Sequence, residues 1–355
     1  GRPVKLETLS GADVSEGHIA TKIHHVSEFA GRRVLSDSPP GHGIPVGYPD
    51  GFSSQGADIM PRRLFMVSIT GSTSSLVSFE TPTTKGPDWY LLSDDKKHKS
   101  FEISRRSIPK EFAHKVWISK HLAPFALNDP ADAILPVSRS TDGTWQLAAP
   151  ADLATSPKAQ RHFDQIIRES DFDSAEELWD QGLDYRKKLT KQRFDSELDE
   201  FLVLYGAGGG IPAASFVSCS DLPKVPPIVD QTLYWALVDS KQEAQYLVGV
   251  LNSSALLASI SAYIPEGEFG GRHLHTLPSK AIPRFDPADE VHTRVAKATS
   301  TVMQQVEAIR DNPTTAAYFS SSRGLAQRRS KIRQLTSELP AYAEYQAACN
   351  ALYQV

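Results

Sequence analysis

The spacing of apolar residues divides the chain into β-like and helix-like stretches. Short apolar runs typical of buried strands lie at 63–69, 90–92, 133–137, 201–205, 214–219 and 232–239. Apolar side chains at helical intervals occupy 156–192, 240–263, 289–311, 323–338 and 340–354. The pattern therefore predicts an α+β fold: a mixed β core with inserted helices, followed by a C-terminal helical segment.

Two helix starts are marked by capping residues. Ser240 precedes an apolar stripe and has Glu243 three residues later, the spacing of a capping box. Asp173 and Glu176 have the same spacing at the start of the second helix in 156–192. That helix begins acidic and ends in basic residues, which agrees with the direction of the helix dipole.

Turn-forming residues suggest where the domains divide. Residues 31–61 are rich in Gly, Pro and Ser, too broken for a long regular element. We therefore predict an irregular lead-in over 1–59, an α+β domain over 60–285 with a helical insert at 156–192, and a helical segment over 286–355.

Composition excludes several classes of protein. With two cysteines, Cys219 and Cys349, the chain cannot build a disulfide framework or a four-cysteine zinc site, and a reducing, cytoplasmic location is expected. No apolar run is long enough to span a bilayer, so no membrane partner is expected. The first residue is Gly rather than Met, which leaves open a longer parent protein.

The net charge of −4 hides several basic clusters. They lie at Lys96–Lys110, at Arg186–Arg193 directly after an acidic stretch, and at Arg323–Arg333. Such clusters are either solvated helix faces or a surface that binds a polyanion, and the sequence leaves both alternatives open.

No catalytic or metal-binding motif is complete. The glycines at 206–210 do not match the dinucleotide-binding spacing, and there is no P-loop. Asp88 and Asp95 lie too close together for the metal site of a nuclease, and His273 and His275 have no third ligand nearby. We therefore predict no catalytic residue and no metal site in this chain.

Four segments, in order along the chain, resemble one family. They are "SSQGADIMPRRLFMV" (53–67), "LDYRKKLTKQ" (183–192), residues 228–256, and "GEFGGRHLHTLPSKAIPRFDPADEVHTRVA" (267–296). Together they resemble the region downstream of the catalytic domain in large adenine-specific (N6) DNA methyltransferases of restriction-modification and phage-defence systems, which carry a TaqI-like C-terminal specificity domain.

The resemblance implies that residues 60–285 form a target-recognition domain that holds double-stranded DNA. A methyltransferase catalytic domain or subunit, using S-adenosylmethionine, would then methylate a flipped adenine. This chain lacks the Gly-rich cofactor loop and the N-P-P-[YF] turn of that catalytic domain. No cofactor is therefore expected in this chain.

The predicted DNA contacts lie within the resembling segments and are Arg62, Arg63, Arg186, Lys187, Lys188, Lys191, Gly270, Gly271, Arg272 and His273. Long basic side chains bind phosphates. The two glycines beside Arg272 carry no side chain, which allows the backbone to approach a base edge closely. For Arg62 and Arg63 a structural ion pair is an equal alternative. For 269–273 the alternative is a turn with a solvated arginine.

A second hypothesis places the function in protein contacts. The helices after Asp289 would pack against a methyltransferase or helicase partner, and the basic clusters would be ordinary solvent faces. Charge reversal at Arg186, Lys187, Lys188 and Arg272 separates the two hypotheses, because only the first predicts DNA binding that is then lost.

Overall fold

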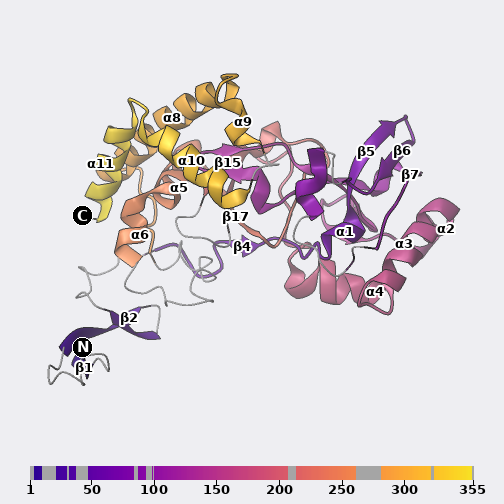
Figure 1. Ribbon diagram of the computed structural model, residues 1–355, viewed down its shortest axis with the longest axis horizontal. Coiled ribbons are helices and arrows are strands. Elements are labelled where there is room, and N and C mark those ends of the chain that lie inside the picture. The colour runs from indigo at the N-terminus through magenta and orange to yellow at the C-terminus, as the bar shows by residue number, and fades with distance from the viewer. Residues whose placement is uncertain are drawn as a thin grey trace, which may run out of the picture.

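A computed structural model describes most of the chain (Figure 1). The described residues are 4–9, 21–29, 32–36, 47–83, 87–92, 98, 100–206, 213–260, 281–320 and 324–353, the first three ranges as backbone. Strands and helices alternate irregularly along these ranges, and the α+β class predicted from the sequence is confirmed.

Two sheets form the centre of the described structure. The larger has the order β16 (Ile228–Val229), β8 (Ala113–Trp117), β11 (Ala131–Ile134), β5 (Met66–Ser72), β6 (Leu76–Glu80), β7 (Arg106–Pro109). The smaller has the order β15 (Ala214–Ser218), β14 (Phe201–Gly206), β17 (Leu233–Val238), β4 (Ser54–Gln55). Neighbouring strands are antiparallel except β16 and β8, which are parallel.

Smaller sheets are separate from these two. A three-stranded sheet has the order β1 (Val4–Leu9), β2 (Thr21–Phe29), β3 (Arg32–Ser36), while β9 (Leu122–Ala123) pairs with β10 (Ala126–Leu127) and β12 (Val137–Arg139) with β13 (Trp145–Leu147). The α-helices are α1 (Arg62–Phe65), α2 (Pro150–Ala154), α3 (Pro157–Glu169), α4 (Ala175–Glu177), α5 (Lys241–Asn252), α6 (Ser254–Ile260), α8 (Glu290–Asp311), α9 (Ala316–Phe319), α10 (Leu325–Ser337) and α11 (Tyr342–Tyr353). Other helical turns are η2 (Pro87–Leu92), η3 (Lys110–Phe112), η4 (Ser119–His121), η5 (Leu178–Leu183), η6 (Tyr185–Lys187) and η7 (Cys219–Asp221).

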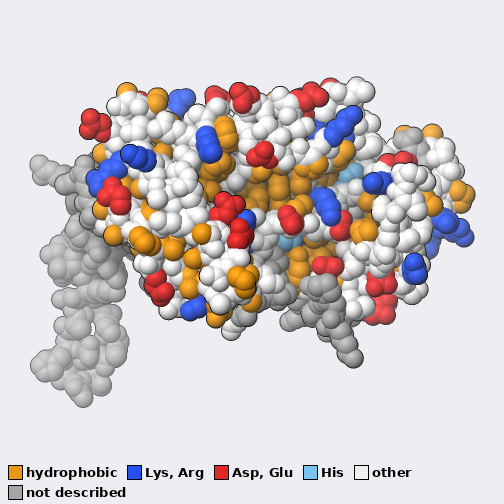
Figure 2. Space-filling view, turned by 90° about the horizontal axis from the view of Figure 1, so that it is seen from above, with side chains coloured by type: hydrophobic (Ala, Val, Ile, Leu, Met, Phe, Trp, Pro, Cys, Tyr) orange, Lys and Arg blue, Asp and Glu red, His pale blue; other side chains and the backbone are white. Residues whose placement is uncertain are grey.

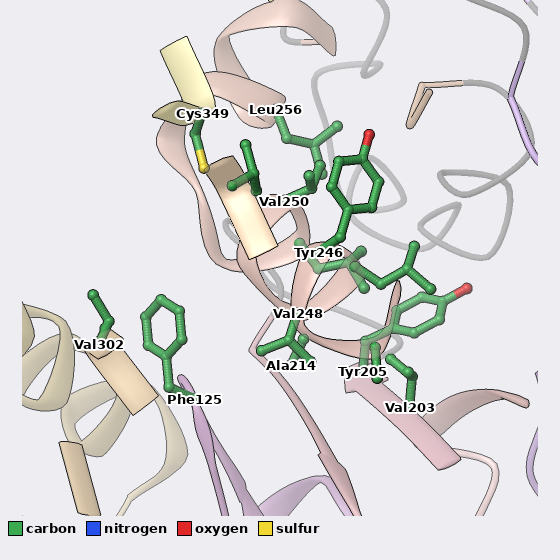
Figure 3. Close-up of a cluster of buried hydrophobic side chains, with 14 of the residues drawn as sticks. Phe125, Val203, Tyr205, Ala214, Tyr246, Val248, Val250, Leu256, Val302 and Cys349 are labelled. Carbon is green, nitrogen blue, oxygen red and sulfur yellow. The ribbon is translucent and has the colours of Figure 1, made fainter. Parts of the chain in front are cut away.

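Strand β14 shows how the core is divided. Val203 and Tyr205 pack into a cluster with α5, α8 and α11, drawn in part in Figure 3. Leu202 and Leu204 point to the opposite side and pack into a separate cluster that contains Trp235. Successive side chains of a strand alternate between faces, so one buried strand supplies both clusters.

The larger sheet has its own core. Its buried side chains pack against α3 and against the leucines of η5, so these helices cover one side of that sheet. Among the described residues, no helix is long and apolar enough to cross a membrane.

Helices α5 and α8 approach each other closely at Gly249. A Cβ placed there would overlap the Thr299 hydroxyl, which is buried and donates to the Val295 carbonyl. The two helices lie on either side of the predicted boundary between 60–285 and 286–355 and share one core. That division of the chain stays a prediction.

Gly249→Ala is therefore expected to destabilise the protein by about 1–3 kcal/mol, the usual cost of overpacking a core. The control is Gly71→Ala, because a Cβ there lies 3.9 Å from the Ser78 Cβ, an ordinary contact. Urea unfolding of both variants measures the difference. Equal stability of the two variants would show that α5 and α8 can separate without cost.

The predicted helix caps are confirmed at one site and shifted at the other. The Ser240 hydroxyl accepts from the Glu243 amide at 3.1 Å, as predicted. At the second site the cap is Ser174 rather than Asp173, and its hydroxyl accepts from the Glu177 amide. The predicted single helix over 240–263 is also interrupted, because Ser253 is extended and separates α5 from α6.

Two of the predicted strands are partly or wholly helical. Residues 62–65 form α1, and the strand begins only at Met66. Residues 90–92 belong to the 3-10 helix η2, where Leu91 and Leu92 are buried. A short apolar run does not distinguish a buried strand from a buried helical turn, so these predictions failed for lack of periodicity.

Candidate nucleic-acid interface

Residues 184–193, called the basic loop below, follow directly on η5. The Asp184 carboxylate organises the loop: its Oδ1 accepts from the amides of Leu189 and Thr190 at 3.0 and 2.7 Å, and its Oδ2 accepts from the Thr190 hydroxyl at 2.5 Å. A carboxylate that accepts several backbone and hydroxyl hydrogens fixes the path of a loop strongly.

The loop is also fastened to the core from within. Leu189 is fully buried in the core of the larger sheet. The buried Gln192 amide bonds the backbone of Val229 in both directions, at 2.9 Å to its carbonyl and 2.8 Å from its amide. Both ends of the basic run are therefore held, and the residues between them are displayed on a fixed frame.

Arg186 and Lys187 have left-handed backbone conformations, with φ of 57° and 58°. Such a conformation costs a non-glycine residue about 1–2 kcal/mol. Strain of this kind persists where surrounding contacts determine the conformation, and it concentrates at functional sites. Here the bonds from Asp184 and Gln192 supply those contacts.

The cations of the loop are largely uncompensated. Arg186, Lys187 and Lys191 are exposed and form no salt bridge within the described part of the chain. Lys188 is half-buried; burial raises the pKa of the nearby Asp58 carboxyl, and the charge of Lys188 lowers it. Lys188 is therefore partly balanced by Asp58, whereas Arg186, Lys187 and Lys191 carry their positive charge without such a partner.

An exposed aromatic ring lies among these cations. The Tyr185 side chain is 41% exposed, whereas most large aromatic side chains in the described residues are buried or half-buried. The Arg186 guanidinium carbon lies 5.1 Å from the centre of its ring and the Lys188 ammonium 5.6 Å. Cation–π contact orients both side chains. A flat ring flanked by cations is a surface on which a sugar or base can pack beside a bound phosphate.

The loop is not the helix end that the sequence predicts. The helix expected to run to residue 192 stops at Leu183, after the π-helical turn η5. The basic residues therefore do not balance a helix dipole, which removes one argument for a purely structural role. Asp184 and Gln192 were not among the predicted site residues, although an acidic residue placed directly before a basic run was a visible signal.

Arg62 and Arg63 are in the interior rather than on this surface. Their exposed fractions are 6% and 5%. The Arg62 guanidinium pairs with the Asp230 carboxylate at 3.3 Å, and Arg63 donates to the Phe101 carbonyl at 3.5 Å. For Arg62 the structural ion pair weighed from the sequence is thus found, and we leave both arginines out of the candidate interface.

The C-terminal basic run is also partly internal. Arg328 and Arg329 are buried and donate to the Leu122 carbonyl, and Arg329 also donates to the Ser119 carbonyl. Burial lowers the pKa of Arg328 to about 10 and that of Arg329 to about 9. These two side chains connect α10 to β9 and η4 and do not face a ligand.

The remaining predicted contacts, Gly270, Gly271, Arg272 and His273, lie outside the described residues and stay predictions. Within the described residues, no group of His, Cys, Asp or Glu is arranged to hold a metal ion. Burial also raises the pKa of the Cys219 thiol to about 11 and that of Cys349 to about 12, so neither is an activated nucleophile.

Comparison with known proteins gives one distant neighbour to report. No family model matches the chain, and no curated protein matches it. Among solved structures, the Type IIL restriction-modification enzyme MmeI in complex with DNA aligns with a TM-score of 0.48 and 9% sequence identity. The alignment covers 99% of this chain and 42% of that one, so the chain spans less than half the length of that enzyme.

Proposed function

We propose that this chain is a sequence-specific DNA-recognition module of an adenine-N6 DNA methyltransferase of restriction-modification or phage-defence type. The observation that carries the DNA contact is the basic loop, in which Arg186, Lys187 and Lys191 are uncompensated and held on a fixed frame. Cations held in register bind phosphates without selecting a sequence, and they orient the protein on the duplex. The assignment to adenine-N6 methyltransferases is supported by the sequence resemblance of 53–67, 183–192, 228–256 and 267–296.

The proposed division of labour follows from what the sequence contains. The basic loop positions the duplex, and Arg272 and His273, beside Gly270 and Gly271, read base edges in the major groove. Methyl transfer and S-adenosylmethionine binding belong to a catalytic domain or subunit of the parent protein. A Gly-rich loop and an N-P-P-[YF] motif directly upstream in the same reading frame would test that part of the proposal.

The double variant Arg186→Glu/Lys187→Glu is expected to weaken binding of duplex DNA on the order of 100-fold at low salt, because two phosphate contacts become repulsive. Glutamate pays a similar cost for a left-handed backbone as arginine or lysine, so the fold is expected to survive. Fluorescence anisotropy with a labelled duplex, repeated over a range of salt concentrations, measures the loss. The slope of log affinity against log salt should also become shallower.

The matched control is Lys224→Glu/Lys297→Glu, which changes the net charge by the same amount at two exposed lysines that are not part of the loop. The control should bind like the parent chain. Equal losses in both variants would mean that DNA senses only overall charge. If the unmodified chain binds no duplex at low salt, the proposal fails and the scaffold hypothesis replaces it.

A further inference from the structure

A second basic region, made of other residues than the basic loop, lies between strands β6 and β7 and helix α3. It is a cavity of about 710 Å³. Five of its lining residues are cations, and one is an acid, Asp164; the cations are Arg105, Arg106, Lys158, Arg161 and Arg168. Figure 2 shows blue Lys and Arg side chains at the right-hand end of the molecule, the end at which Figure 1 draws these elements.

Helix α3 presents its cations on one face for a simple geometric reason. Ser156 caps the helix and Pro157 begins it. Its buried side chains, including Phe163 and Ile166, face the core of the larger sheet. Lys158, Arg161, Gln165 and Arg168 follow one another at intervals of three and four residues, so they form a stripe along one side of the helix.

Arg106 is held against the cavity wall by neutral partners. It donates to the Gln165 side-chain oxygen at 2.6 Å and lies 3.4 Å from the His162 Nδ1. An arginine only donates, so Nδ1 is the acceptor and the proton of His162 resides on Nε2. Burial, together with the charge of Arg106, lowers the pKa of His162 to about 3. Arg106 thus stays the cation of this pair, with spare N–H groups.

The cavity lacks the acidic partners that other charged residues of the chain have. Lys115 pairs with Asp132, and Arg294 with Glu344. In contrast, none of the five cavity cations forms a salt bridge in the part of the chain that the structure describes. A concave site lined by one sign of charge concentrates the opposite charge. The charge of this cavity therefore favours a negatively charged ligand.

We propose that this cavity is a phosphate-binding site, separate from the basic loop, that takes a run of adjacent phosphate groups. Arginine forks bind phosphate oxygens in pairs, and Arg105, Arg106 and Arg161 line one space. A volume of about 710 Å³ falls in the range of small-molecule sites, larger than a single phosphate needs. Adjacent phosphates occur both in a DNA strand and in a free polyphosphate chain such as that of ATP.

The variant Arg105→Glu/Arg161→Glu tests the site, because both side chains are exposed and neither packs in the core. The parent chain is titrated with inorganic tripolyphosphate, with ATP and with duplex DNA at low salt, with calorimetry for the first two ligands. We expect at least a tenfold loss of tripolyphosphate affinity in the variant. The control Lys224→Glu/Lys297→Glu should keep that affinity, and the loop variant Arg186→Glu/Lys187→Glu should lose less of it than the cavity variant.

The DNA titration identifies the source of the phosphates. If a DNA strand enters the cavity, the cavity variant also loses duplex affinity, and its loss adds to that of the loop variant. If a free polyphosphate is the ligand, duplex affinity is unchanged and ATP binding is lost. Unchanged tripolyphosphate and duplex affinities in the cavity variant would overturn the inference. Tripolyphosphate binding without any duplex binding would uphold the cavity and refute the proposed function.

Discussion

Asp230→Ala is expected to lower the free energy of unfolding by about 3–5 kcal/mol, the usual cost of leaving one charge of a buried pair without its partner. Asp230 is fully buried, and its Oδ1 accepts from the Arg62 guanidinium and from the amide and hydroxyl of Thr232. Without it, the buried Arg62 guanidinium loses the carboxylate of its ion pair. A loss of this size is a large fraction of the stability of a typical domain.

The paired replacement Arg62→Met/Asp230→Leu isolates the role of charge. Thr232 loses its acceptor in both variants, so the difference between them reports on keeping the Arg62 guanidinium in the interior without the Asp230 carboxylate. We expect the pair to be several kcal/mol more stable than Asp230→Ala, because apolar groups of similar volume substitute well for a buried ion pair. Urea unfolding at neutral pH makes the comparison. If Asp230→Ala lowered the free energy of unfolding by less than about 1 kcal/mol, the Arg62 side chain would have turned out to solvent in that variant.

The double variant Arg62→Met/Asp230→Leu should have little effect on DNA affinity. Arg62 lies inside the protein and is no part of the basic loop, so the folded double variant is expected to bind a duplex like the parent chain. This separates a structural arginine from a contacting one, although both occur in segments that resemble the same family.

Elements whose signals are local could be predicted from the sequence. The strands at 201–205 and 232–239 and the helix after Asp289 appear in the structure close to the expected bounds. The cap at Ser240 was also predicted correctly. In each case the apolar spacing or the capping residue lies within a few positions of the element that it specifies, so no distant contact is needed to decide it.

The site required information from distant parts of the chain. Arg62 and Asp230 are separated by 168 positions, and nothing in either local sequence shows that they pair. Exposed and buried arginines look alike in a sequence, so nothing in the run Arg323–Arg333 showed that Arg328 and Arg329 are buried. The left-handed turn at Arg186 depends on Gln192 reaching β16, a tertiary contact that overrides the helical pattern of the preceding residues.

Lowering the pH from 7 to 5 is expected to destabilise the protein by about 2 kcal/mol for each of His114, His121 and His162. Burial lowers the pKa of His114 to about 4, that of His121 to about 3 and that of His162 to about 3, from an ordinary value of 6.5. The unfolded chain therefore takes up protons over this range while the folded chain does not. The stability is complete above about pH 6.5 and is lost as the pH falls toward the folded pKa values.

His121 is the most informative of the three. The Ile118 amide donates to its Nδ1 at 3.0 Å and the Tyr90 hydroxyl lies 2.9 Å from its Nε2, so a proton on Nδ1 would break the first bond. Arg328 and Arg62 add to the depression of its pKa. His121→Asn keeps an acceptor for the Ile118 amide and does not titrate. Its stability should consequently fall by about 2 kcal/mol less than that of the parent chain between pH 7 and pH 5.

Urea unfolding of the parent chain and of His121→Asn at several pH values measures both slopes. Asp58 works in the opposite direction, because burial raises the pKa of its carboxyl and stability gained from its protonation grows as the pH falls. Its ordinary value of 3.8 lies below pH 5, so it opposes the histidines mainly at the acidic end of the range. A stability that stays constant from pH 7 to pH 5 in both proteins would mean that the buried imidazoles reach solvent and carry protons in the folded state.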